Sequence, residues 1–413
     1  MTNIFGYLLY IISIKTYFSL IRIASFVNHK AKLSIDGRKN VFEHIQQRLK
    51  AEKRKSYWFH CASLGEFEQA RPIIEKLKAN QPEFAIIITF FSPSGYEIKK
   101  DYSGADYIFY LPFDSRSNAE KFIQIIKPEK AFFIKYEFWY HFLNTLQQFK
   151  VPTYLIAAHF TTNQLFFRWY GGFFRSLLKN FTHIFTQFED DITLLKSINI
   201  YEATFAGDTR FDRVYEHAKQ PKELPLISKF CQNKKVIILG SSYHHEEEMM
   251  GSIMQGFSED TVVIVAPHEV NNKRITQIES TFSGEMCCRL SHFQTETKCN
   301  VLIIDNIGML SNAYQYADVA FVGGGFGKKG LHNILEPLAM GCFVITGPNN
   351  HEKFPEIKMA ISAGVAAIAG NKDELTSLLF QQSKQLFSMH RTIESRQFIK
   401  NNIGATNKIL LLI

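Results

Sequence analysis

The chain has 413 residues, of which 46% are apolar and 21% are charged. This length predicts two or three domains, and the composition excludes a disordered, collagen-like or disulfide-rich protein. The net charge of +8 lies entirely within residues 1–60, which hold eleven Lys and Arg against three Asp and Glu. Since the rest of the chain is balanced, we expect no nucleic acid partner, and the basic N-terminus fits an anionic membrane surface better.

The six cysteines show no Cys-x-x-Cys pair and no repeated spacing. The sequence therefore predicts neither a zinc site nor a disulfide framework, and we expect buried thiols in a reducing compartment.

The N-terminal segment 4–27 is apolar apart from Lys15, Arg22 and a few small polar residues. A spanning helix needs about 20 apolar residues, so this segment is marginal in length. No basic region precedes it and no cleavage site follows it, which argues against a signal peptide. We expect residues 1–35 to form a membrane-embedded or interfacial helix and a basic segment that faces the cytoplasm. The alternative is a hydrophobic helix packed on the body of the protein.

From residue 57 onward, short β-rich runs alternate with amphipathic segments, which is typical of a parallel sheet covered by helices. Two sets of such runs are separated by a polar, proline-bearing stretch at 217–225. The first set is 57–61, 85–91, 107–111, 130–134, 153–158 and 182–186, and the second is 235–240, 261–266, 300–305, 318–325, 342–347 and 364–370. This pattern predicts an α/β protein with two Rossmann-like domains, 36–215 and 216–413, whose ligands bind at the carboxyl ends of the strands.

Two glutamates occupy equivalent positions in the first domain, each directly after a strand. Glu66 lies three residues after Ser63, so it either completes a capping box or faces the ligand as a proton acceptor. Glu137 either complements a helix dipole or serves the same site. Arg210, near the domain junction, can bind phosphate or carboxylate in a bidentate manner, or can pair with Asp208 or Asp212.

The second domain carries three polar stretches after its strands. Residues 240–242 are small and precede a helix with acids at 246–248, which suits an anionic ligand better than a metal. The glycine-rich segment 323–330 contains GxGxxG, but the acid expected about 20 residues later is missing, and Lys329 excludes a Walker A loop. The segment 332–337, His-Asn-Ile-Leu-Glu-Pro, can direct Glu336 at a ribose diol, or can be a capping Asn followed by a first-turn acid.

Together these stretches, with the apolar and basic N-terminus, resemble the 3-deoxy-D-manno-octulosonic acid (Kdo) transferases, which are GT-B glycosyltransferases of lipopolysaccharide assembly. The resemblance extends to about residue 360, and its most specific parts are Ser-Leu-Gly-Glu at 63–66 and the segment 332–337. It implies two domains that face each other across a cleft, an N-terminal domain for the acceptor and a C-terminal domain for CMP. It also implies transfer of Kdo from CMP-Kdo to a lipid A precursor at the cytoplasmic face of the inner membrane, without a metal or other cofactor.

The resemblance assigns roles to particular residues. Glu66 matches the general base, and Glu137 and Arg210 match residues that stabilise the transition state. The positions that match CMP-binding stretches are Pro267, His268, Gly308, Met309, Leu310, Asn333, Ile334, Leu335 and Glu336. Two positions depart from the family pattern, because Lys135 stands where an acid is usual and His268 where a basic residue is usual.

Other functions fit the sequence less well. A nicotinamide-dependent oxidoreductase lacks its acidic residue, whereas a GT-B transferase for another nucleotide sugar and a non-catalytic GT-B membrane scaffold are the remaining alternatives. A Glu66 that caps a helix would have a lowered pKa, which conflicts with its role as a base.

Overall fold

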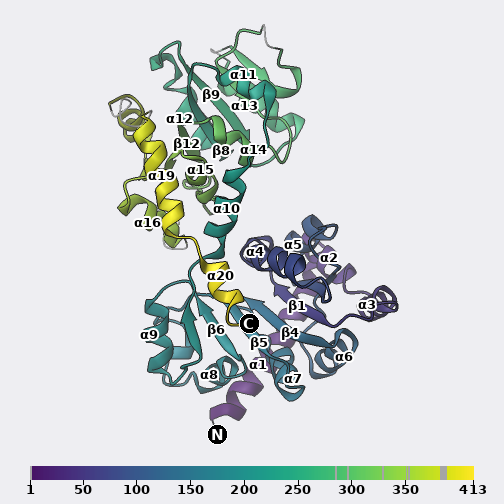
Figure 1. Cartoon of the computed structure of the whole chain (residues 1–413). Coiled ribbons are helices and arrows are strands. Elements are labelled where there is room, and N and C mark those ends of the chain that lie inside the picture. Colours follow the sequence, from purple (N-terminus) through teal and green to yellow (C-terminus); the bar gives the residue numbers. More distant parts are fainter. Residues whose placement is uncertain are drawn as a thin grey trace. The chain divides into compact units, whose positions relative to one another are not determined.

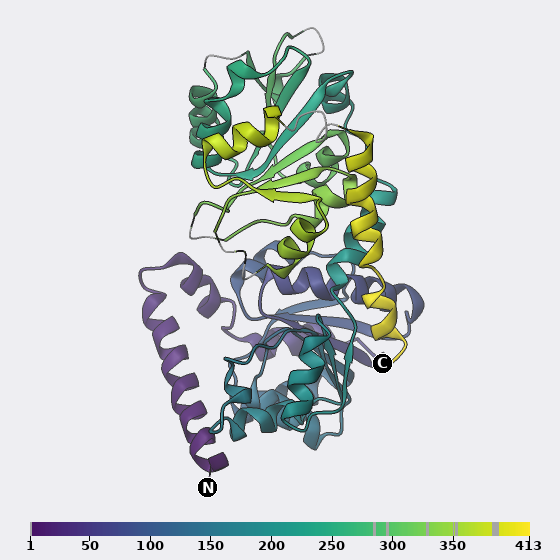
Figure 2. The ribbon, with the colours of Figure 1, turned by 90° about the vertical axis from the view of Figure 1, so that its left-hand side faces the viewer.

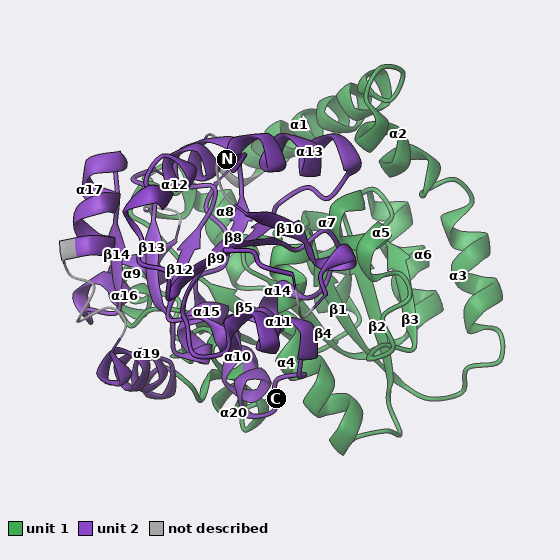
Figure 3. Cartoon of the chain, turned by 90° about the horizontal axis from the view of Figure 1, so that it is seen from above, with its two compact units in different colours: residues 1–212, 403–413 green, residues 213–402 purple. Residues whose placement is uncertain are grey.

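The computed structural model describes residues 2–283, 286–294, 297–327, 330–349, 351, 354–381 and 388–413. The chain forms two compact units, coloured separately in Figure 3: residues 1–212 with 403–413 make unit 1, and residues 213–402 make unit 2. The sequence places residues 403–413 in the second domain, whereas in the structure they pack in unit 1, because the short C-terminal helix buries Ile409 in the core of that unit.

Unit 1 is built on a parallel sheet of seven strands in the order β3-β2-β1-β4-β5-β6-β7 (Figure 1). The strands are β1 Ser56–Cys61, β2 Ala85–Phe90, β3 Tyr107–Tyr110, β4 Pro128–Ile134, β5 Thr153–Ala158, β6 His183–Thr186 and β7 Ala203–Phe205. The helices are α1 Thr2–Ala24, α2 His29–Asp36, α3 Val41–Leu49, α4 Leu64–Asn80, α5 Pro93–Lys99, α6 Arg116–Ile126, α7 Tyr140–Gln148, η1 Leu165–Phe167, α8 Gly172–Leu178, α9 Asp190–Ser197 and α20 Ala405–Leu410, and α10 Thr209–Lys219 begins here.

Unit 2 repeats this architecture with a second parallel sheet in the order β10-β11-β9-β8-β12-β13-β14. Its strands are β8 Lys235–Ser242, β9 Thr261–Pro267, β10 Cys287–Arg289, β11 Val301–Ile303, β12 Val319–Val322, β13 Phe343–Thr346 and β14 Ala366–Ile368. Its helices are α11 Pro225–Cys231, α12 His244–Gly251, η2 Met254–Gly256, α13 Asn272–Thr281, η3 Leu290–His292, α14 Leu310–Ala313, η4 Tyr314–Tyr316, α15 Leu335–Met340, α16 Pro355–Ser362, α17 Lys372–Thr376, η6 Ser377–Gln381 and α19 Met389–Asn401.

The strands of unit 1 are mostly apolar because both faces of the sheet are covered. Trp58 and Phe133 belong to the hydrophobic core on one face. Their chain neighbours Phe59 and Phe132 belong to the core on the other face. Successive side chains of a strand point to opposite faces, so a continuous apolar run is the pattern of a strand buried on both sides.

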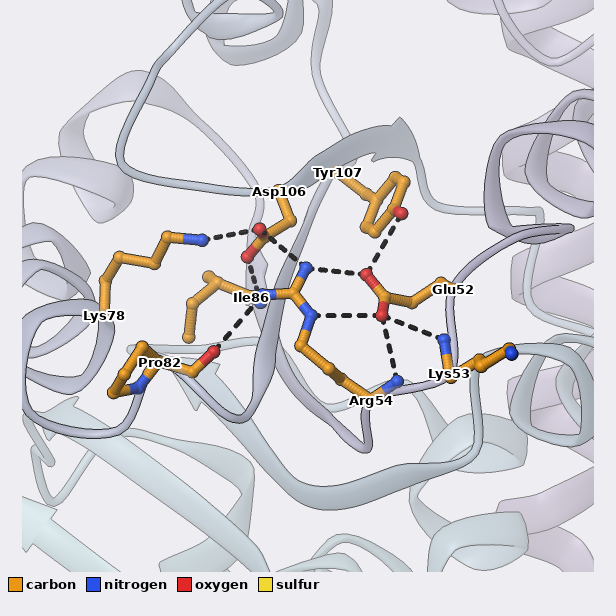
Figure 4. Close-up of polar contacts among 8 residues, drawn as sticks. All are labelled: Glu52, Lys53, Arg54, Lys78, Pro82, Ile86, Asp106 and Tyr107. Atoms are coloured by element: carbon orange, nitrogen blue, oxygen red, sulfur yellow. Dashed lines mark hydrogen bonds and ion pairs between the residues drawn. The ribbon is translucent and has the colours of Figure 1, made fainter.

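An ion-pair network holds the amino ends of β1, β2 and β3 together (Figure 4). The Arg54 guanidinium contacts Glu52 at 2.6 Å and Asp106 at 2.9 Å, and Asp106 also accepts the backbone N–H of Ile86 at 2.8 Å. Hydrogen bonds from Arg54 lower the pKa of Glu52 to about 2 despite partial burial. This network fixes the edge of the sheet opposite to the carboxyl ends of the strands.

Helix α1 lies along unit 1, as Figure 2 shows in purple, and does not extend away from it. The Tyr10 hydroxyl donates to the buried Asp114 at 2.5 Å and accepts the Tyr140 N–H at the start of α7. The Phe18 ring lies 4.2 Å from that of Phe113. Over residues 4–24 the helix is also long and apolar enough to cross a membrane. One face of α1 is therefore docked on the body, and the other face remains apolar and exposed.

Candidate active site

Both sheets have a topological switch point, where the chain turns from one side of the first strand to the other. In unit 1 it lies between β1 and β4, and in unit 2 between β8 and β12. Ligands of open α/β sheets bind at the carboxyl ends of the strands at this point. Glu66 follows β1 and Glu137 follows β4, so the two predicted glutamates flank the switch point of unit 1.

Glu66 lies in the first turn of α4, where its carboxylate accepts the backbone N–H of Ala62. Among the described residues, no capping bond joins the Ser63 hydroxyl to the α4 backbone, so only the carboxylate half of the capping box forms. Burial raises the pKa of Glu66 to about 8, and the charge of Glu137 acts in the same direction. The Ala62 and Ser63 N–H groups and the charge of Lys135 oppose this shift without cancelling it.

Glu137 lies in the loop between β4 and α7, three residues before the helix begins. Its carboxylate accepts a hydrogen bond from the Trp139 indole at 2.6 Å and lies 2.9 Å from His60 Nε2, which is also 3.0 Å from the Trp139 indole nitrogen. Glu137 is therefore held by side chains, and the alternative of a first-turn acid does not describe its surroundings.

His60 is fully buried at the end of β1 and connects Glu137 to the interior. Its Nδ1 lies 2.9 Å from the Thr89 hydroxyl, which also accepts the Trp58 indole N–H at 2.8 Å. When the Thr89 hydroxyl donates to Nδ1, the proton of a neutral imidazole is on Nε2 and points at Glu137. The series of contacts from Trp58 through Thr89 and His60 to Glu137 therefore helps to fix the position of the carboxylate.

Arg210 forms a bidentate ion pair with Asp208, with contacts of 2.9 and 2.6 Å to Oδ2. Burial alone would raise the pKa of Asp208, but the charge and hydrogen bonds of Arg210 outweigh it and the pKa is lowered. The charge of Lys135 acts on both Asp208 and Glu66, which places these groups in one electrostatic neighbourhood. Asp212, the other partner considered for Arg210, instead accepts the N–H groups of Gly404 and Thr406.

The predicted residues of unit 2 also follow the carboxyl ends of strands, of which β11 and β9 are neighbours and β12 is separated from β9 by β8. His268 comes after β9 and the loop of Gly308 after β11, and His332 follows the glycine-rich loop after β12. The rings of His268 and His332 lie 4.5 Å apart, and the Tyr243 hydroxyl contacts His332 Nε2 at 3.2 Å. Burial, with the charge of His268, lowers the pKa of His332 to about 4. A neutral imidazole among aromatic rings can stack on a base or sugar.

The residues of the segment 333–336 differ in which of their groups are available to a ligand. Ile334 and Leu335 have buried side chains, so only their backbone is available to a ligand. Asn333 Oδ1 accepts the Leu335 N–H at 2.9 Å, the local turn expected of an Asn at a helix start. Glu336 is half-buried in the first turn of α15, and its charge raises the pKa of the buried Tyr314 hydroxyl, although burial itself raises it more.

Close approach of neighbouring backbone explains why glycines occur in the glycine-rich loop. A Cβ on Gly323 would lie 2.3 Å from the Ser241 carbonyl oxygen, and one on Gly325 would lie 2.5 Å from the Gly347 nitrogen. Gly324 has φ +92° and donates its N–H to the buried Glu246. Lys328 and Lys329 lie outside the described residues. In the described part of the loop, close approach of neighbouring strand ends accounts for the glycines.

The described residues contain no group of three or more His, Cys, Asp or Glu side chains placed to hold a metal ion. The acids at 246 and 247 are engaged otherwise. Glu246 completes a capping box with Tyr243, and Glu247 accepts from Ser242 and Arg274.

Comparison with known proteins identifies the relatives of this chain. Residues 39–213 match the family model described as 3-deoxy-D-manno-octulosonic-acid transferase (kdotransferase). The 3-deoxy-D-manno-octulosonic acid transferase of Aquifex aeolicus is 27% identical over 330 residues, which cover 78% of this chain and 84% of the relative. The transferase of the same name from Rickettsia prowazekii is 27% identical over 401 residues, covering 91% and 83%.

The chain is therefore similar to Kdo transferases over most of its length. It is a glycosyltransferase, as its relatives are.

Solved structures confirm the predicted α/β fold of GT-B type. A glycosyltransferase from Rickettsia africae aligns with a TM-score of 0.56 at 11% identity, covering 87% of this chain and 98% of that one. A putative UDP-N-acetylglucosamine 2-epimerase from Listeria monocytogenes aligns with a TM-score of 0.60 at 13% identity, covering 87% and 95%. At these identities the likeness concerns the fold.

Several polar residues around this transferase's predicted site were not singled out from the sequence. His60 ends a buried strand that is otherwise mostly apolar, and that placement was the available signal. Trp139 and Tyr243 carry no such signal, because their partners Glu137 and His332 are recognised as partners only in the folded chain. Lys135 was noted only as a departure from the family, yet its φ of +60° and its effect on Glu66 place it at the site.

Proposed function

We propose that this transferase moves Kdo from CMP-Kdo to a lipid A precursor, with Glu66 as the general base. The observation that carries the proposal is the raised pKa of Glu66, about 8, at the switch point of unit 1. A base works best when its pKa lies near the working pH, and an ordinary glutamate would be too weak. The similarity to Kdo transferases suggests the substrate class.

The proposed reaction is a direct displacement with inversion. The Glu66 carboxylate accepts the proton of an acceptor hydroxyl, and the acceptor oxygen forms a bond to the anomeric carbon of Kdo. The bond from that carbon to the CMP phosphate oxygen breaks, and CMP leaves with the bonding electrons. Positive charge that develops on the sugar is stabilised by Glu137, whose position is fixed by His60 and Trp139.

We assign Arg210 to the stabilisation of the same transition state, in which it acts while paired with Asp208. Asp208 holds the guanidinium by two contacts, which orients its plane. Lys135 adds a cation close to Glu66 and Asp208, where an acid is usual in the family. In this chain we assign stabilisation of the anionic groups of the donor to Arg210 and Lys135 together.

For CMP we propose the strand ends of unit 2. The matching residues are Pro267, His268, Gly308, Met309, Leu310, Asn333, Ile334, Leu335 and Glu336, of which Ile334 and Leu335 contribute backbone groups only. Glu336 is assigned to the ribose diol, and the rings of His268 and His332 to stacking and polar contacts with the nucleotide.

We further propose that the protein acts at the cytoplasmic face of the inner membrane. The exposed apolar face of α1 and the basic excess of residues 1–60 support this placement, since positive segments remain on the cytoplasmic side. No metal or organic cofactor enters the proposed reaction.

The decisive experiment combines CMP-Kdo, a lipid A precursor and the purified full-length chain, with the product identified by mass. Glu66→Gln should keep CMP affinity but lower kcat on the order of 10²–10⁴-fold, because Gln can still accept the Ala62 N–H but cannot accept a proton. Glu336→Ala should show the reverse pattern, with CMP binding weakened by roughly 1–3 kcal/mol.

UDP-N-acetylglucosamine is the matched donor control, and it should give no product. Near wild-type transfer by Glu66→Gln would remove Glu66 as the base. Unchanged CMP affinity of Glu336→Ala by calorimetry would remove Glu336 from the nucleotide site.

A further inference from the structure

A short loop in unit 1 exposes large aromatic side chains. Between β5 and α8, Trp169 is 88% exposed and Tyr170 is 54% exposed, and Leu165 at the start of η1 is also exposed. Tryptophan is mostly buried in soluble proteins, whereas Trp and Tyr are enriched where one end of a side chain is apolar and the other meets water. We therefore expect the loop 165–171 to bind a partner through these side chains.

The loop has a fixed shape. Arg175 Nη1 in α8 donates to the carbonyl oxygens of Phe166 at 3.0 Å and Arg168 at 2.8 Å. A Cβ on Gly171 would lie 1.8 Å from the Leu165 carbonyl oxygen, so the turn closes tightly on itself. The aromatic side chains are thus presented outward by a braced backbone.

The loop lies in a stretch of the sequence that has basic but no acidic residues. Residues 138–188 contain no Asp or Glu, and the same is true of residues 1–35. Arg168 and Lys179 are exposed on the two sides of the loop and α8. An exposed apolar tip with exposed basic residues nearby in the sequence fits an anionic lipid surface, because basic residues near such a surface are attracted to it.

The loop is continuous with helix α1. Gly6 of α1 lies against Phe173, four residues after Trp169, and the Tyr10 ring lies 5.9 Å from that of Phe173. The N-terminal end of α1 and α8 lie together in Figure 1. On the outer face of α1 the exposed apolar residues are Ile4, Phe5, Leu8, Leu9, Ile12, Leu20 and Ile23.

We propose that the loop 165–171 inserts its aromatic tip into the interface of an anionic bilayer beside α1, so that unit 1 docks through two elements. Helix α1 then lies in the plane of the interface, because its inner face is held on unit 1 through Tyr10 and Phe18. At 1.5 Å per residue, its exposed apolar residues from Ile4 to Ile23 span about 30 Å. The proposal rests on the proposed membrane association and extends it to a second segment.

The test uses the full chain and vesicles of phosphatidylcholine with about one third phosphatidylglycerol. The double variant Trp169→Ala with Tyr170→Ala should lose about tenfold or more of its vesicle affinity, since two large apolar groups no longer enter the interface. Tyr201→Ala is the matched control, because Tyr201 is an equally exposed aromatic of unit 1 that has Glu202 beside it, and it should bind as wild type does.

Insertion is read directly from fluorescence with brominated lipids. The chain has three tryptophans, and Trp58 is fully buried. Bromolipids should quench a component of the emission that Trp169→Phe removes, while the component that remains in Trp169→Phe should be much less affected.

The outcomes separate this inference from the proposed function. Full vesicle affinity of the double variant, or unquenched Trp169, would overturn the insertion of the loop whatever the transfer assay gives. Self-association that the double variant abolishes would assign the loop to a second copy of the chain and would also overturn it. Transfer to a detergent-dispersed acceptor should be unchanged in the double variant, whereas a wild-type chain without transfer activity would contradict the proposed function alone.

Discussion

A carboxylate that accepts backbone N–H groups at the start of a helix is ordinarily more acidic than a free one, and Glu66 departs from this behaviour. Its pKa is about 8 because burial and the charge of Glu137 outweigh the N–H groups of Ala62 and Ser63 and the charge of Lys135. Capping and base catalysis are therefore compatible in this position. The same N–H groups that complete the helix start also hold the carboxylate in place.

This pKa predicts the pH dependence of the reaction. Only the deprotonated carboxylate accepts a proton, so kcat should rise with pH between about 6 and 9, with an inflection near 8. The measurement is kcat at saturating CMP-Kdo and acceptor across that range. A kcat that does not change across that range would mean that Glu66 has an ordinary pKa in the complex and would contradict the prediction.

The stability of the protein should change with pH in the opposite direction to kcat, which provides a control. The folded state raises the pKa of Glu66 above its ordinary value of about 4.5, so its contribution to stability is fully present below pH 4.5 and is lost as pH rises through about 8. Glu66→Gln removes this dependence. Relative to wild type, the melting temperature of the variant should therefore increase from pH 5 to pH 9.

Elements differ in how far the sequence determines them. The run 85–90 is recognised as a strand because each of its residues is buried on one face or the other. In contrast, β7 and β10 have three residues each, and Cys287–Arg289 is neither β-rich nor apolar throughout, so both strands were missed. Short edge strands are formed through pairing with a neighbour, which the local sequence does not encode.

The residues of the candidate site also differ in how far the sequence predicts them. Positions directly after strands could be predicted for Glu66 and Glu137, because parallel strands bring their carboxyl ends to one edge. The contact of His60 with Glu137 joins residues 77 positions apart, and no local pattern reports such a contact. The sequence allowed α1 to be a membrane helix or a helix packed on the body. One face of α1 is docked on unit 1, and its other face is apolar and exposed.

Tyr10 makes α1 part of the fold of unit 1. Its hydroxyl donates to Asp114, which also accepts the His141 and Phe142 N–H groups at the start of α7. Tyr10→Phe should lower the free energy of unfolding by about 1.5–3 kcal/mol, the scale of a hydrogen bond to a charged group. Denaturant unfolding in detergent measures this, with Tyr7→Phe as the control, and equal stability of both variants would show that Tyr10 contributes no such bond.

At the scale of the whole molecule, the last eleven residues belong to the first unit. Ile409 is buried in the core of unit 1, Lys76 donates to Asn407 at 2.7 Å, and Asp212 holds the start of α20, where Gly404 has φ +113°. Unit 1 is therefore closed by the end of the chain.

Ile409→Ala tests this closure. The substitution should destabilise unit 1 by about 2–5 kcal/mol, the usual cost of truncating a buried isoleucine. Hydrogen exchange followed by mass spectrometry should show faster exchange in β1 and β4 and unchanged exchange in β8 and β12. Leu411→Ala is the control, because Leu411 is exposed. Equal acceleration in both sheets would show that the two units unfold together.

The division of the chain also orders events during synthesis. Residues 213–402 lie between the two parts of unit 1, so they must all be made before α20 can close it. At about 5–20 residues per second this takes roughly 10–40 seconds. Helix α1 leaves the ribosome before the rest of unit 1, and unit 2 can complete its own sheet while unit 1 still lacks α20. We therefore expect the nascent chain to reach the bilayer through α1 before the base, Glu66, has its final surroundings.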